Sequence, residues 1–134
     1  MNTLTVLDVS VTVERIECAR LSDRATQDSK STYTLNVGLL EKERGLDGLT
    51  INFNLELVGS PQLAKLVVSG SAKLTGSDND VREALSQESE RTPPKVVETI
   101  YEKLYGLIYL LTVSMRVPFP QPNLLKKSSQ ATTR

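Results

Sequence analysis

Apolar and polar residues alternate along four stretches of the first 75 residues, and near the C-terminus the apolar spacing changes to three or four. Along residues 7–13 every second residue is Leu or Val, which predicts a β-strand with one buried face. The apolar phase then moves by one residue, to Ile16 and Cys18. An extra residue at Glu14 or Arg15, as in a β-bulge, would return both side chains to the buried face, so Cys18 is expected to be a small core residue.

Three further stretches, residues 32–42, 49–57 and 62–75, show the same alternation and are predicted strands. Glycine-containing turns at 45–48 and 59–61 join them. Because these turns are short, the three strands are expected to form an antiparallel meander. In the first of the three, the inward positions are Tyr33, Leu35, Val37 and Leu39.

Two polar connections complete the strand region. The stretch of residues 21–31 has no periodicity and is too long for a tight hairpin. It is expected to be either a flexible connection or a crossover between strands that are not neighbours. After the fourth strand, Asp78 or Asp80 could cap a short helix around residues 81–87.

The one long stretch with helical periodicity predicts a helix from Pro94 to Arg116, with Thr92 near its N-cap. From Leu104 onward, apolar side chains occupy most of its circumference, so the helix needs cover on more than one side. One small sheet cannot supply that cover, and we therefore expect a dimer or a tetramer. Gly106 is either a point where another backbone approaches closely or a tolerated glycine on an ordinary helix.

The predicted fold class is α+β, with a four-stranded antiparallel sheet whose apolar face is covered by the long C-terminal helix. We expect one domain over residues 1–125, followed by a disordered tail at 126–134 that is polar and basic.

Composition narrows the function classes. The chain has 134 residues, with 16 Lys+Arg against 16 Asp+Glu, so no net positive field favours nucleic acid as a partner. The single cysteine cannot form an intramolecular disulfide, and the N-terminus lacks a secretion signal pattern, so a cytoplasmic location is expected. The apolar half of the long helix is too short to insert in a membrane.

Candidate catalytic chemistry is sparse. The chain has no histidine, and its glycines match neither phosphate-binding nor dinucleotide-binding motifs. The acidic run that starts at Asp78 lacks the spaced ligands of a calcium loop and is interpreted as a helix cap. Glu98 and Glu102, one helical turn apart, are interpreted as solvated rather than catalytic. We expect no enzymatic activity, and no metal or other cofactor.

Tyrosines recur along one edge of the long helix, at Tyr101, Tyr105 and Tyr109, and Thr112 continues the row. A tyrosine side chain can bury its apolar ring while its hydroxyl stays hydrated, which suits an interface or the border of a groove. The alternative is that these rings lie at the border of the helix's apolar face and pack against the sheet. Together with Gly106, this row is our candidate oligomer interface.

The order of elements, and a short motif after the helix, resemble the SecB-like protein-export chaperones. In that family the long helix leads into a loop of the form FPQxNL, which Phe119, Pro120, Gln121, Asn123 and Leu124 match here. The resemblance implies an ATP-independent holdase that binds unfolded polypeptides. It also implies a dimer of dimers with the long helices between the sheets, and client grooves walled here by residues 22–31 and 117–125.

Holding a client requires apolar surface that stays open after assembly, because the core faces are already used. The residues expected to provide this surface are Tyr33, Phe119, Leu124 and Leu125. Unlike export chaperones of this type, the chain is neutral, lacks a second C-terminal helix and is only 4% aromatic. A general export chaperone, a dedicated chaperone of a toxin–antitoxin system, and a non-catalytic structural subunit therefore stay open as alternatives.

Overall fold

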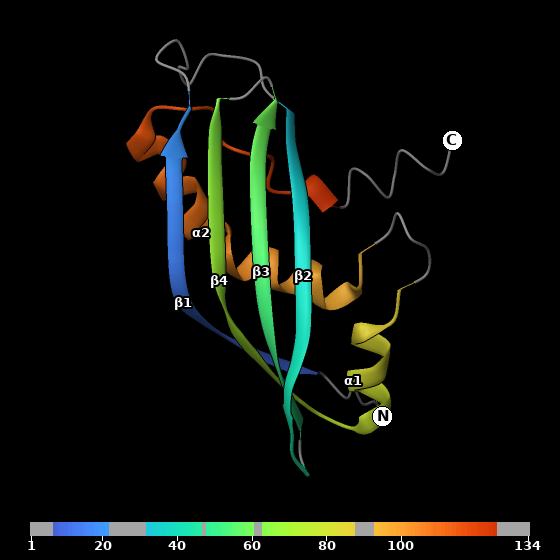
Figure 1. Cartoon of the computed structure of the whole chain (residues 1–134). Coiled ribbons are helices and arrows are strands. Elements are labelled where there is room, and N and C mark those ends of the chain that lie inside the picture. Colours follow the sequence, from blue (N-terminus) through green and yellow to red (C-terminus); the bar gives the residue numbers. More distant parts are fainter. Residues whose placement is uncertain (1–6, 22–31, 47, 61–62, 88–92, 126–134) are drawn as a thin grey trace, which may run out of the picture.

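The computed structural model describes residues 7–21, 32–46, 48–60, 63–87 and 93–125. The expectations for Thr92, for the groove wall at 22–31 and for the tail at 126–134 lie outside these residues. The structure is α+β, as predicted, with a four-stranded antiparallel sheet and a long helix (Figure 1). In chain order the elements are β1 (Asp8–Arg20), β2 (Thr32–Arg44), β3 (Gly48–Ser60), β4 (Ala64–Thr75), α1 (Asp78–Leu85) and α2 (Lys95–Met115).

The strand order is β1-β4-β3-β2, and each neighbouring pair is antiparallel. Strands β2, β3 and β4 form the expected meander. Strand β1 pairs with β4 and not with β2, so the connection after β1 is a crossover, one of the two alternatives that its length allowed. Strands β1 and β2 are therefore the two edges of the sheet.

The predicted bulge in β1 is confirmed by a shift of register between Val13 and Arg15. At this point the backbone of β1 lies against Gly70 on β4, where a Cβ atom would collide with the carbonyl oxygen of Thr12. Glycine is therefore required at position 70 because the adjacent strand leaves no room for a side chain.

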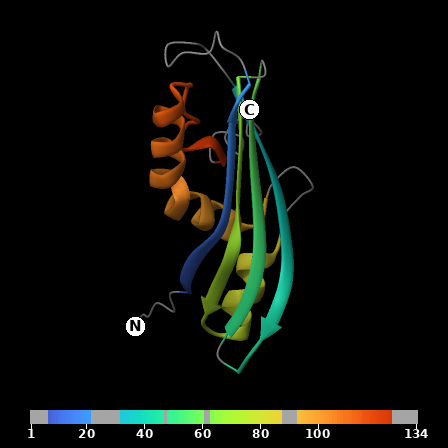
Figure 2. The same cartoon turned by 60° about the vertical axis from the view of Figure 1, so that its left-hand side comes forward.

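Helix α2 covers one face of the sheet and crosses it diagonally, from behind β2 to behind β1 (Figures 1 and 2). The core between the two layers is almost entirely aliphatic. Its fully buried large side chains include Leu49, Ile51, Leu55, Leu57, Leu66, Leu74, Ile100, Tyr101 and Ile108.

The ends of α2 differ slightly from the prediction. Pro94 is the N-cap residue and makes no side-chain cap, but its carbonyl oxygen accepts from the N–H of Val97 at 3.0 Å. Arg116, which was expected in the last turn, is the C-cap residue and has φ 58° and ψ 44°. This left-handed conformation lets the N–H of Val117 reach the carbonyl oxygen of Thr112 at 3.0 Å, and it turns the chain back toward the sheet.

Helix α1 begins at a different cap from either predicted one. Ser77 lies in the extended region just before the helix, and its hydroxyl oxygen accepts from the N–H of Asp80 at 3.2 Å. Asp78 and Asp80 lie inside the first turn, where the helix dipole favours a carboxylate. The cap prediction was therefore wrong by one residue for Asp78 and by three for Asp80.

The prediction that Ile16 and Cys18 are core residues was also wrong. They oppose Val68 and Leu66, which are buried, so both lie on the predicted face of the sheet. However, β1 is an edge strand, and within the described residues this part of it is not covered. Ile16 is 43% exposed, and Cys18 is exposed as well.

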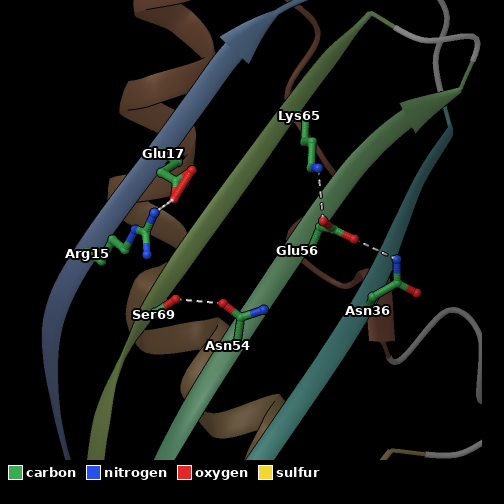
Figure 3. A network of polar contacts seen from close by, with 7 residues as sticks. All are labelled: Arg15, Glu17, Asn36, Asn54, Glu56, Lys65 and Ser69. Carbon is green, nitrogen blue, oxygen red and sulfur yellow. Dashed lines mark hydrogen bonds and ion pairs between the residues drawn. The ribbon is translucent and has the colours of Figure 1, made fainter.

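The opposite face of the sheet is polar, and Figure 3 shows its central contacts. Glu56 accepts a hydrogen bond from Asn36 at 3.1 Å and pairs with Lys65 at 3.2 Å, which ties β2, β3 and β4 together. The hydrogen bond from Asn36, followed by the contact with Lys65, lowers the pKa of Glu56. Because this face is polar, apolar ligands have to bind elsewhere on the molecule.

Candidate functional site

Three tyrosine hydroxyls anchor the segment that follows α2. Tyr33 on β2 donates to the carbonyl oxygen of Pro118 at 2.6 Å. From α2, Tyr101 donates to the carbonyl oxygen of Gln121 at 2.7 Å, and Tyr105 donates to that of Pro120 at 2.8 Å. The carbonyls of this proline-rich segment lie outside any helix or sheet ladder, so side-chain donors have to satisfy them.

Burial raises the pKa of Tyr33 to about 12, and burial also raises the pKa values of Tyr101 and Tyr105. All three hydroxyls therefore stay protonated at neutral pH and can act as donors. Tyr33 joins β2 to the segment from Val117 to Gln121, and Tyr101 and Tyr105 join α2 to the same segment, so the segment is held from both elements.

The residues of the tyrosine row on α2 differ in how far they are buried. Tyr101 is enclosed within the chain and Tyr105 is half-buried, which matches the alternative that the rings edge the apolar stripe. Thr112 is fully buried, and its hydroxyl donates to the carbonyl oxygens of Ile108 and Tyr109. Tyr101 and Thr112 therefore differ from the interface expectation, because neither side chain reaches the surface.

The outer surface of α2 is apolar at its centre. Tyr109 is 44% exposed and Leu110 is 61% exposed. Gly106 is exposed too, and a Cβ atom added there would meet nothing within 4 Å, so no backbone approaches it within the described part of the chain. The ring of Phe119, itself exposed, lies 5.1 Å from the ring of Tyr109. We call Gly106, Tyr109, Leu110 and Phe119 the outer patch.

A groove of about 610 Å³ lies along the edge strand β2. One wall is β2 itself, through Tyr33–Val37 and Leu39. The other wall is formed by Gln87, Pro93, Pro94, Leu124 and Leu125. Figure 1 shows the last described segment, in red, and the start of α2 beside β2, in agreement with this lining. We call this feature the β2 groove.

Among the residues that the structure describes, none that lines the β2 groove is charged. Leu35, Val37 and Leu39 lie on the helix side of the sheet and are only half-buried, as are Leu124 and Leu125. The groove therefore offers aliphatic side chains and uncharged polar groups together, which suits an uncharged apolar ligand.

The structure brings together three of the four residues expected to bind clients: Tyr33, Leu124 and Leu125 line the groove. Tyr33 contributes little apolar surface, since it is 5% exposed and bound to Pro118. Phe119 belongs to the outer patch. Sequence reasoning missed the contribution of Leu35, Val37 and Leu39 because it assigned them to the core, and only the strand order shows that β2 is an edge.

Among the described residues, no group of three or more His, Cys, Asp or Glu side chains is placed to hold a metal ion. Glu102, one of the paired carboxylates considered from the sequence, is exposed, and Glu98 is half-buried. No helix within the described ranges is both long and apolar enough to cross a bilayer.

No protein-family model and no curated protein sequence matches the chain. The fold is similar to that of a SecB-like chaperone from Mycobacterium tuberculosis, solved in complex with a ChAD peptide from the HigA1 antitoxin. The TM-score is 0.57 and the sequence identity is 14%, over 85% of this chain and 84% of that chain. At this identity the likeness establishes a shared fold.

Proposed function

Starting from the SecB-like fold, we propose that this protein is an ATP-independent chaperone that holds non-native polypeptides in the β2 groove. The observation that carries the proposal is a partly aliphatic groove of about 610 Å³, open beside an edge strand, whose described lining residues carry no charge. Full burial of one Leu or Val side chain contributes roughly 1.5–3 kcal/mol, so a few contacts there suffice for reversible capture. The proposed activity is binding, and it requires neither nucleotide nor metal.

The SecB-like neighbour supports a polypeptide as the ligand, because that protein was solved with a peptide bound. Two client classes fit the groove equally well: varied unfolded proteins, as in export, and one dedicated antitoxin. The test is to measure both the breadth of clients and the dependence of capture on groove residues.

We further propose that the protein assembles with copies of itself through the outer patch. Between Lys103 and Arg116 the helix carries no charged residue, although the sheet covers only one side of it. An exposed apolar strip on a helix of this length is typical of an interface.

The decisive experiment measures light scattering while several unrelated reduced proteins aggregate in the presence of this protein. We expect suppression by the wild type and a clear loss with Leu124→Ala combined with Leu125→Ala. Leu40→Ala is the matched control, because Leu40 is 68% exposed on the same strand but does not line the groove.

Phe119→Ala gives a second comparison, since it alters the outer patch and leaves the groove lining intact. Suppression of several clients supports a general holdase, and suppression of one client alone supports a dedicated chaperone. A folded protein that suppresses no aggregation contradicts the chaperone proposal and leaves the structural-subunit alternative.

A further inference from the structure

Another pocket, of about 330 Å³, lies where the N-terminal end of β1 meets both helices. Its described lining residues come from these three elements: Leu7, Val9, Asp80, Glu83, Ala84, Lys95, Val96 and Thr99. Figure 1 shows the start of β1, in dark blue, running toward α1, in agreement with this lining. The pocket and the β2 groove have no described lining residue in common. We call this feature the α1 pocket.

One carboxylate of the α1 pocket lacks a partner. The Oδ2 atom of Asp80 is buried, and among the residues that the structure describes no group donates a hydrogen bond to it. None of the ion pairs within the described residues includes Asp80 either, since Lys95 pairs with Glu83 at 3.4 Å. A buried carboxylate oxygen without a donor raises the free energy of the folded state, so a ligand that supplies an N–H is favoured there.

The charges around the α1 pocket do not balance. Its described lining carries two carboxylates, Asp80 and Glu83, and one ammonium group, Lys95, which leaves a net charge of −1. The side chains of Lys95 and Glu83 are 61% and 68% exposed, so their pair lies in water at the rim of the pocket. Asp80 is less exposed than Glu83 and is therefore the carboxylate that a cationic ligand would neutralise.

The rest of the described lining favours a small organic cation. Leu7, Val9, Ala84 and Val96 are aliphatic, so they can bury the alkyl carbons of a ligand. Thr99 adds a hydroxyl oxygen, which can accept a second hydrogen bond from an ammonium group with three donors. A volume of about 330 Å³ lies at the lower end of the range for small-molecule sites.

We propose that the α1 pocket binds a small aliphatic primary amine in its ammonium form. The ammonium group donates to the carboxylate of Asp80, and the alkyl chain packs against the aliphatic lining. Binding requires the carboxylate to turn about its χ2 torsion, which is soft for aspartate. This ligand site goes beyond the proposed chaperone function, because it lies beside β1, at the opposite edge of the sheet from the β2 groove.

The test titrates the full chain with pentylamine hydrochloride and follows residue-resolved NMR shifts at constant ionic strength. We expect saturable shifts at the amides of residues 80–84 and 95–99, and little change along residues 33–39 of β2. The matched ligand control is 1-pentanol, which has the same chain length and a hydroxyl in place of the ammonium group. Because it cannot neutralise Asp80, its affinity should be about tenfold lower.

Three variants test the role of charge. Asp80→Asn keeps the shape of the side chain and removes its charge, so the dissociation constant for pentylamine should rise about tenfold. Asp78→Asn is the matched control, because Asp78 is exposed in the same helical turn but does not line the pocket. Lys95→Gln changes the net charge of the lining from −1 to −2, and should tighten binding by about threefold.

The outcomes are separable from those of the aggregation assay. Equal affinity for pentylamine and 1-pentanol, saturable shifts confined to other parts of the chain, or unchanged affinity in Asp80→Asn each overturns this inference and leaves the chaperone proposal as it stands. If Asp80→Asn does not fold, the 1-pentanol comparison on the wild type and the Lys95→Gln variant decide. A protein that binds pentylamine as expected but suppresses no aggregation supports the amine site and removes the chaperone proposal alone.

Discussion

The hydroxyl of Tyr33 donates to the carbonyl oxygen of Pro118 at 2.6 Å, across a separation of 85 residues. This hydrogen bond connects the edge strand β2 to the segment that follows α2. Since Tyr33 lies on one wall of the β2 groove and the chain after Pro118 leads to the other, the bond helps to set the width of the groove.

The first prediction concerns this bond. Tyr33→Phe leaves the carbonyl of Pro118 buried without its donor, and should lower the free energy of unfolding by about 1–3 kcal/mol. Urea denaturation measures the change. Tyr109→Phe, at a ring that is 44% exposed, is the control and should change stability by less than about 0.5 kcal/mol.

The second prediction is a pH dependence. Burial raises the pKa of Tyr33 from 10.0 to about 12, so the folded state holds this proton more tightly than the unfolded state does. The stability that Tyr33 contributes is therefore complete below pH 10 and is lost as the pH rises toward about 12. The free energy of unfolding should fall across this window, and less steeply in Tyr33→Phe. Equal slopes in the two proteins would contradict the assignment.

The third prediction compares two glycines within strands. Gly70→Ala places a Cβ atom against the β1 backbone at the bulge, and should cost on the order of 3 kcal/mol. Gly38→Ala is the matched control, because the nearest atom, the Cβ of Asn54, would lie 3.8 Å away. That change should be neutral or stabilise by up to about 1 kcal/mol. Thermal unfolding of both variants measures the difference, and equal melting temperatures would mean that β1 and β4 are spaced differently.

The fourth prediction tests assembly. Gly106→Leu meets no atom within 4 Å in the single chain, so the fold should tolerate it and gain about 0.5–1 kcal/mol from better helix propensity. If the outer patch is buried against a second copy, the same side chain overpacks the contact and lowers the oligomer mass in sedimentation. An oligomer whose mass does not change would remove Gly106 from the interface.

Much of the fold could be predicted because the alternation of residues is local information. The faces of all four strands, and the bulge between Val13 and Arg15, follow from a period of two and one change of phase. The boundaries of α2 follow from its flanking prolines, with an error of one residue at each end.

The remaining errors share a physical cause, which is that exposure depends on neighbours the local pattern does not specify. Ile16 and Leu35 lie on the predicted face, yet both are left partly open because their strands are the sheet edges. The partners of Tyr101 and Tyr105 depend on the path of the chain after α2, which no periodicity encodes.

The prolines after α2 have a further consequence for the molecule. Pro118, Pro120 and Pro122 supply no backbone N–H; the first two lie outside any helix or strand, and Pro122 lies in a turn. The carbonyl oxygens of Pro118 and Pro120 already accept from the hydroxyls of Tyr33 and Tyr105. The segment is therefore poorly able to pair as a further strand with the sheet beside it.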